Sequence, residues 1–138
     1  MNAALVYRWD GKPIRLCFEI IEGAYDQDSI LLFLRRLRQE FRGRPITLVW
    51  DGLRAHRTSL IEQYVRRSRG RLKIIPLPPY APEMNPTEYL WANIKGGELA
   101  NAVPPGIRDL CKLAVKGVRR AERRQLLKGF VRAAGLFF

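Results

Sequence analysis

Apolar positions along the chain recur with two different spacings, which predict an alternation of strands and helices. The β-prone runs Ala3–Trp9 and Ile14–Ile21 flank Asp10-Gly11, and this pattern predicts a hairpin because glycine tolerates the positive φ of a tight turn. The next apolar residues recur at helical spacing and predict a helix. Asp26 or Asp28 is available as its N-cap, and Gly43 is expected to end it. Its apolar positions are Ile30, Leu34, Leu37 and Phe41.

The middle of the chain alternates short apolar runs with a helical pattern. Ile46–Trp50 predicts a strand buried on both faces, which Asp51-Gly52 ends. Ser59 and Glu62 have the spacing of a capping box and predict a short helix to about Ser68. Leu72–Pro76 predicts the next strand, parallel to the first, and the five prolines from Pro76 to Pro86 then predict a stiff, extended loop.

Three further helices are predicted after this loop. Asn85-Pro86-Thr87-Glu88 is typical of a helix start, and Gly96-Gly97 ends that helix after Lys95. After Pro104-Pro105, one helix carries Leu110, Leu113, Ala114 and Val118, and a last helix covers about Ala121–Ala134. This order, with two hairpin-linked strands, two further strands that alternate with helices and a final run of helices, indicates an α/β fold with a mixed sheet covered by helices.

Composition and charge narrow the class of protein. The 138 residues favour one domain, 1–138, and the net charge of +12 favours a polyanionic partner, most often nucleic acid. A basic ribosomal-type or membrane-surface protein is the alternative. No signal peptide and no apolar run long enough to cross a membrane are found, which predicts a cytoplasmic protein. Cys17 and Cys111 fit no metal spacing and are interpreted as small buried hydrophobes in a reducing compartment.

Two carboxylates and a basic segment are the candidate functional groups. Asp51 lies at the carboxyl end of a predicted strand, and the proline loop could return Glu88 to its neighbourhood. Each also has a structural interpretation, as a turn residue for Asp51 and as a helix cap for Glu88. The basic C-terminal part, 105–138, can contact DNA phosphates or simply form a solvated face. Its paired arginines at helical spacing are Arg119, Arg120, Arg123 and Arg124.

Residues 46–95 resemble the DDE transposase family, in the bacterial insertion-sequence branch related to Tc1/mariner elements. The matching features are Asp51 after an apolar strand, His56, the run LPPYAPEMNPTE at Leu77–Glu88, Trp91 and Lys95. The resemblance implies a ribonuclease H-like fold and DNA transposition, with transposon ends and target DNA as partners. It also implies a site of three carboxylates that hold two Mg²⁺ or Mn²⁺ ions.

Carried over to this chain, the resemblance makes Asp51 the second carboxylate and Glu88 the third. Arg54, His56, Arg57 and Lys95 become candidate DNA contacts beside them. The first carboxylate and its strand have no match, since Asp10 falls in a turn. The chain is therefore expected to be a truncated, weakly active or inactive form that lacks the first strand.

A missing central strand would expose unpaired strand edges, and a homodimer is expected from this. A non-catalytic DNA-binding or dimerising remnant of a transposase is the second hypothesis. A basic structural protein whose carboxylates are helix caps is the third. For the preferred hypothesis the expected location is the bacterial cytoplasm, in association with the nucleoid.

Overall fold

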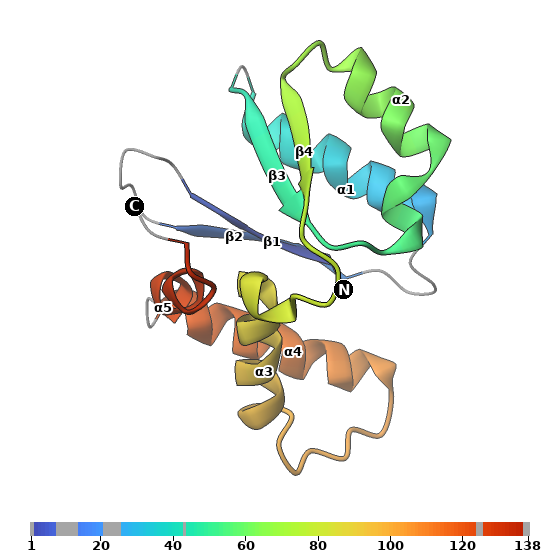
Figure 1. Ribbon diagram of the computed structural model, residues 1–138. Helices are drawn as coiled ribbons and strands as arrows, with labels where there is room; N and C mark the ends of the chain where they lie inside the picture. Colours follow the sequence, from blue (N-terminus) through green and yellow to red (C-terminus); the bar gives the residue numbers. More distant parts are fainter. Residues whose placement is uncertain (1, 8–13, 21–25, 43, 124–125, 137–138) are drawn as a thin grey trace. The chain divides into compact units, whose positions relative to one another are not determined.

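The computed structural model describes residues 2–7, 14–20, 26–42, 44–123 and 126–136 (Figure 1). Strands and helices follow one another in the order predicted from the sequence, with two short 3-10 helices added, η1 at Arg54–Arg57 and η2 at Pro82–Met84. The chain divides into two compact units. One is built on Glu19–Ala81 and the other on Ala3–Phe18 and Pro82–Phe138. That both units belong to one domain stays a prediction.

The four described strands form two sheets of two strands each. β1 (Asn2–Val6) pairs with β2 (Arg15–Glu19), and β3 (Ile46–Trp50) pairs with β4 (Leu72–Pro76). The predicted mixture of strands and helices is confirmed. Within the described residues, however, the strands form two separate two-stranded sheets instead of one mixed sheet. The expected turn at Asp10-Gly11 lies outside the described residues.

In the first unit, α1 (Gln27–Glu40) and α2 (Ser59–Arg67) cover one face of the β3–β4 sheet. The strands run parallel, with Ile46 opposite Leu72 and Trp50 opposite Pro76, as predicted. Burial alternates along β3, and Val49 on the uncovered face is 44% exposed. The prediction that β3 is buried on both faces is therefore wrong, because helices pack against only one of them. The buried core on the covered face consists of Ile30, Leu31, Leu34, Ile61 and Leu72.

The two helices of this unit begin differently. α1 (Gln27–Glu40) starts at Asp26, whose side chain accepts from the backbone N–H of Ser29, so Asp26 is the N-cap of the two candidates. α2 (Ser59–Arg67) starts after Thr58 and has no side-chain cap hydrogen bond. The predicted capping box of Ser59 and Glu62 is wrong, because the N-cap is Thr58, one residue earlier. The Glu62 carboxylate instead pairs with Arg66, with 3.7 Å between Oε2 and Nη2. Gly43, the predicted stop of the first helix, lies outside the described residues.

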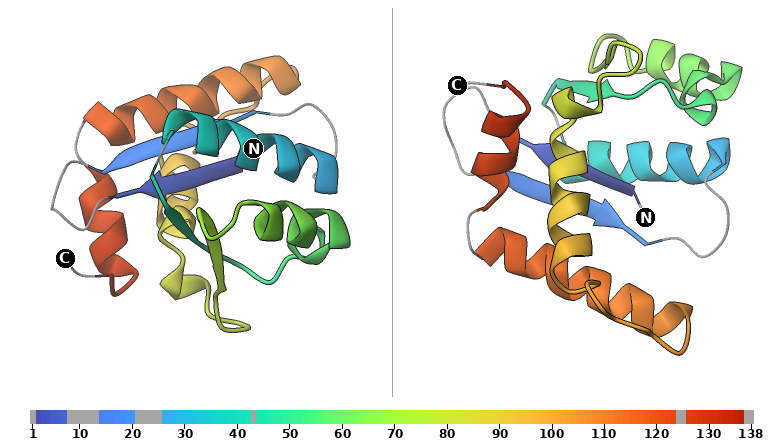
Figure 2. Two further views of the ribbon diagram at one scale, coloured as in Figure 1. Left: turned by 90° about the horizontal axis from the view of Figure 1, so that it is seen from above. Right: turned by 60° about the horizontal axis from the view of Figure 1, so that its bottom comes forward.

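In the second unit, α3 (Pro86–Gly96), α4 (Ile107–Arg123) and α5 (Leu126–Ala133) pack on one another (Figure 2). α4 continues to Arg123, so the predicted start of the last helix at Ala121 is wrong. Gly117 permits the close approach of α3 and α4, since a Cβ there would lie 2.9 Å from Cγ1 of Ile94. The side chains that fill this interior are Leu90, Ile94, Val118, Ala121, Leu127 and Val131.

Two further expectations can be compared with the described residues. None of the described helices has the length and apolar character needed to cross a bilayer. Cys17 and Cys111 are both half-buried rather than fully buried.

Candidate active site and DNA-binding surface

Asp51 follows the last residue of β3, at the carboxyl end of the β3–β4 sheet. Its side chain is 54% exposed, and its Oδ1 accepts a hydrogen bond from the backbone N–H of Leu53 at 3.1 Å. Oδ2 has no hydrogen-bond partner within the described part of the chain. The half-exposed carboxylate is thus oriented through one oxygen, and the other is available to a ligand. The structural interpretation of Asp51 as a turn residue accounts for the bond from Leu53 to Oδ1, but it gives no role to Oδ2.

His56 is the second group that orients Asp51. Its Nδ1 lies 3.0 Å from Oδ1 of Asp51 and 3.3 Å from the Asp51 carbonyl oxygen. Because both of these atoms are acceptors, Nδ1 carries the proton. The imidazole also stacks on Trp50, with 4.2 Å between ring centroids and an interplanar angle of 7°. The geometry of His56 favours orientation of the Asp51 carboxylate as its role, beside the predicted contact with DNA.

The proline loop starts beside Asp51. The backbone N–H of Leu77 donates to the carbonyl of Trp50 at 2.7 Å, which extends the β3–β4 pairing by one bond beyond Pro76. The first residue of the loop is therefore tied to the residue before Asp51. This confirms that the loop leaves the sheet at the edge where the aspartate lies, as expected for parallel strands.

Glu88 lies in the first turn of α3, in the second unit. Asn85 caps this helix by accepting from the backbone N–H of Thr87 at 3.1 Å. The carboxylate of Glu88 is exposed and makes no hydrogen bond to a described residue, so it takes no part in the cap. The capping-box interpretation of Glu88 is accordingly not supported, and its oxygens are available for another ligand.

The start of α3 is held by Tyr89. Its hydroxyl lies 3.1 Å from the Glu83 carbonyl oxygen and 3.2 Å from the Ala133 carbonyl oxygen, and its single proton can be donated to either. This contact connects η2 and α5 to the helix turn that carries Glu88. Lys95 is exposed seven residues after Glu88, on the same face of α3 and about 10 Å along the helix axis. The half-buried Trp91 lies between them on that face.

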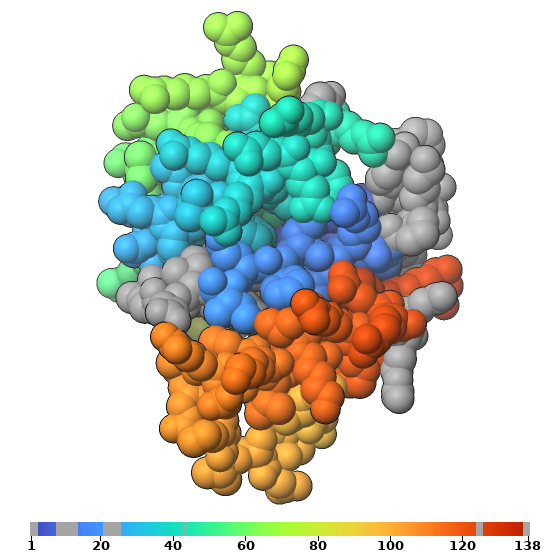
Figure 3. Space-filling model, turned by 180° about the vertical axis from the view of Figure 1, so that it is seen from behind, coloured from blue at the N-terminus to red at the C-terminus, as the bar shows by residue number. Residues whose placement is uncertain are grey.

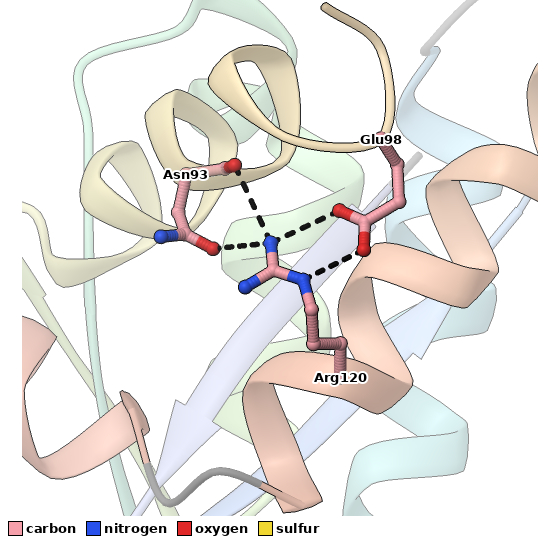
Figure 4. Close-up of polar contacts among 3 residues, drawn as sticks. All are labelled: Asn93, Glu98 and Arg120. Atoms are coloured by element: carbon pink, nitrogen blue, oxygen red, sulfur yellow. Dashed lines mark hydrogen bonds and ion pairs between the residues drawn. The ribbon is translucent and has the colours of Figure 1, made fainter.

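Arg120 has a different role from the predicted one. Its Nε donates to Oε1 of Glu98 at 2.6 Å, and its Nη2 donates to Oε2 of Glu98 at 2.9 Å and to Oδ1 of Asn93 at 2.6 Å (Figure 4). The Glu98 side chain is only 9% exposed. The guanidinium donates to Glu98 and thereby lowers the pKa of that carboxyl group, while the carboxylate raises the pKa of Arg120. Arg120 thus joins α4 to α3, and these bonds engage the guanidinium that was predicted to contact DNA.

A basic stripe runs along the outer side of α4. Its members follow one another at intervals of four, four, three and four residues, which keeps them on one face of a helix. All five are exposed, and α4 lies along the surface in Figure 3. Lys112 is paired with Asp109 at 2.8 Å, whereas Arg119 and Arg123 make no ion pair with a described residue. We define the α4 stripe as Arg108, Lys112, Lys116, Arg119 and Arg123.

Sequence reasoning named only Arg119 and Arg123 of the α4 stripe, although the four-residue spacing would have identified the other three. Arg124 lies outside the described residues. Arg54 and Arg57 are both exposed in η1, directly after Asp51. Gly52 makes room for Arg57, since a Cβ at position 52 would lie 2.9 Å from Nη2 of that arginine.

The donor chemistry at Asp51 and Glu88 suits a hard divalent cation, because both present exposed carboxylate oxygens. The two residues belong to different units, Asp51 to the first and Glu88 to the second. Among the described residues, no group of three or more His, Cys, Asp or Glu side chains is arranged to hold a metal ion. Each carboxylate therefore fits as an individual ligand of such an ion.

Comparisons with known proteins identify the family. Residues 11–110 match the family described as DDE superfamily endonuclease. The chain belongs to this family. Its structure is similar to that of the catalytic domain of Mos1 mariner transposase, with a TM-score of 0.54 and 13% sequence identity over 99% of this chain and 81% of that chain. No curated protein matches the chain.

Membership of the DDE endonuclease family confirms the resemblance drawn from the sequence. The fold is a ribonuclease H-like arrangement of small sheets flanked by helices. DDE endonucleases generally use divalent metal ions, and the family is associated with DNA binding and transposition. The matched range includes Asp51, His56, Glu88 and Lys95.

Proposed function

We propose that Asp51 and Glu88 are the second and third carboxylates of a two-metal site for DNA strand cleavage and transfer in transposition. The observation that carries this proposal is the orientation of Asp51, whose exposed carboxylate is held at a strand end by Leu53 and His56. Mg²⁺ or Mn²⁺, when bound, would activate the attacking oxygen and stabilise the leaving oxygen. The residues of this chain would hold the ions and orient the carboxylates toward them.

The charge balance predicts weak metal binding by this chain alone. Two divalent ions bring four positive charges, whereas Asp51 and Glu88 supply two negative charges. The exposed Arg54 and Arg57 add positive charge next to Asp51, which opposes a cation there in the absence of DNA. We therefore propose that the chain by itself is weakly active or inactive in strand cleavage.

Metal titration with matched variants tests the two ligands. We expect Mn²⁺ to broaden the NMR signals of residues next to Asp51 and Glu88, and D51N and E88Q each to abolish the broadening at its own position. D28N and E122Q are the matched controls, since each removes one exposed carboxylate from the first and second unit. Unchanged broadening in D51N and E88Q would refute the ligand assignment and favour purely structural carboxylates.

Plasmid nicking tests the proposed role of Asp51 in DNA strand cleavage. The chain alone is expected to nick supercoiled DNA weakly or not at all, and a fusion to a first-strand segment that carries an aspartate is expected to nick it in Mn²⁺. D51N in that fusion must abolish the activity, whereas D28N must not. Efficient nicking by the chain alone would contradict the predicted weak site.

The second candidate function is a non-catalytic DNA-binding or dimerising transposase remnant. The α4 stripe favours it, because contacts between exposed cations and phosphates need no metal. The partners in either case would be transposon ends and target DNA, in the nucleoid of a bacterial cytoplasm. DNA binding by the D51N/E88Q double variant with unchanged affinity, and no cleavage by the fusion, would select this function.

Dimerisation through strand pairing is supported by the free edge of β3. Within the described residues β3 pairs only with β4. The backbone N–H of Ile46 points to β4. Because backbone groups alternate in direction along a strand, the N–H and C=O groups of Thr47 and Val49 point away from β4, to the unpaired edge of β3. We expect light scattering to show a homodimer at micromolar concentration, and V49P to reduce it by removing an edge donor. A clean monomer for the unmodified chain would refute this arrangement.

A further inference from the structure

Tyr80 is a large aromatic side chain that no described residue covers. It follows Pro78 and Pro79, its relative exposure is 101%, and its hydroxyl has no hydrogen-bond partner among the described residues. Its backbone φ is 58°, in the left-handed region that a bulky side chain rarely adopts. A strained backbone conformation that presents an unburied ring is more common at functional sites than elsewhere.

The loop that carries Tyr80 is stiff and anchored. Prolines at positions 78, 79 and 82 restrict the backbone on both sides of the tyrosine. The loop begins at Leu77, whose N–H donates to the carbonyl of Trp50. Three residues of chain span at most about 11 Å, so the Tyr80 backbone lies within that distance of Leu77. The ring is therefore held near the end of the β3–β4 sheet at which Asp51 lies.

Two exposed arginines lie in the segment that follows Asp51, after the end of β3. Arg54 and Arg57 are exposed in the η1 segment that follows Asp51, and neither forms an ion pair with a described carboxylate. An exposed aromatic ring together with exposed arginines is the combination by which proteins bind unpaired nucleotides: the ring stacks on a base and the cations contact phosphates. Exposed apolar side chains are also present in the neighbouring segments, with Leu53 at 50% and Ile75 at 41% exposure, so burial of the ring by a protein partner is kept as an outcome of the test.

We propose that Tyr80 is a stacking platform for an unpaired nucleobase of the DNA strand that is bound at Asp51. This inference rests on the proposed function, and it adds the form of the substrate: a strand end or distorted duplex with at least one base out of the stack. Tyr80 would hold that base, while Arg54 and Arg57 contact the adjoining phosphates.

The test uses the full chain and two DNA probes, a blunt duplex and the same duplex with a short single-stranded 3′ overhang that carries 2-aminopurine. Stacking on Tyr80 should change the fluorescence of 2-aminopurine and favour the overhang probe. Y80A should weaken overhang binding about tenfold and leave the affinity for blunt duplex unchanged. Y80F, which retains the ring, should bind like the unmodified chain. Thermal unfolding of each variant checks that the fold is intact.

The possible outcomes separate this inference from the proposed function. If Y80A binds the overhang as tightly as the unmodified chain and gives the same fluorescence change, Tyr80 is not the platform, although DNA binding stands. If Y80F fails as Y80A does, the hydroxyl rather than the ring is needed, which also overturns stacking. A change in self-association without a change in fluorescence would assign Tyr80 to a protein interface. Failure of the unmodified chain to bind either probe would refute the DNA-binding function itself.

Discussion

The imidazole Nδ1 of His56 lies 3.0 Å from Oδ1 of Asp51. The hydrogen bond joins η1 to the residue after β3 and leaves Oδ2 of the aspartate without a hydrogen-bond partner among the described residues. A histidine that holds a carboxylate in this way defines the direction in which the free oxygen points. Its effect on a bound ion is therefore indirect, and His56 is a positioning residue.

Replacement of His56 should weaken Mn²⁺ binding at Asp51. Groups that orient a metal ligand typically affect affinity tenfold or more, so we expect H56A to raise the Mn²⁺ concentration needed for NMR broadening near Asp51 by about tenfold. H56N retains a donor close to the position of Nδ1 and should recover part of the loss. Equal loss in H56A and H56N would indicate that stacking on Trp50, not the hydrogen bond, is the contribution of this residue.

The Arg120–Glu98 ion pair should stabilise the second unit. R120A leaves a largely buried carboxylate unpaired, and we expect it to lower the free energy of unfolding by about 3 kcal/mol. In the double variant R120M/E98Q neither charge is buried alone, so much of this loss should be recovered. Denaturant unfolding of both variants and of E98Q measures the coupling. R119A removes a neighbouring exposed arginine as the matched control and should change stability little.

Acid should destabilise the protein partly through the same pair. Hydrogen bonding to Arg120 lowers the pKa of Glu98 below its ordinary value of 4.5. As the pH falls, the Glu98 carboxylate is therefore protonated at a higher pH in the unfolded chain than in the folded chain. The stabilisation is present above the ordinary value and is lost as the pH falls through the lowered pKa. Hydrogen bonding to the backbone N–H of Ser29 lowers the pKa of Asp26 in the same direction.

Denaturant unfolding as a function of pH checks this expectation. The unmodified chain should lose stability below about pH 4.5, and E98Q should show a smaller loss over the same range. D26N should reduce the loss independently, because Asp26 and Glu98 belong to different units. Identical pH profiles for E98Q and the unmodified chain would contradict the assignment to Glu98.

The α4 stripe should determine the salt dependence of DNA binding. Each phosphate contact contributes about 0.9 to the slope of log affinity against log salt, so R119A/R123A should reduce the slope by about 1.8. The control R35A/R67A removes the same charge from exposed positions of the first unit. Equal effects of the two double variants would mean that net charge, and not the stripe, is responsible.

Local patterns in the sequence were sufficient for the elements around the site. The apolar runs at Ile46–Trp50 and Leu72–Pro76 coincide with β3 and β4, and their parallel pairing was predicted. Asn85 caps α3 as expected. These features depend on neighbours in the chain, such as a proline that restricts φ or a side chain that accepts from the next turn, and the sequence displays such neighbours directly.

Only the tertiary structure decided which side chains the charged and polar residues contact. Arg119 and Arg120 are adjacent in the sequence, yet one is exposed and the other is enclosed by Glu98 and Asn93. His56 contacts Asp51, and the Trp50 ring beneath it was not foreseen. The sequence by itself determined the family, the elements and the candidate carboxylates. The partners of those groups depend on the packing of helices and loops that are distant in the chain, and no local pattern contains that packing.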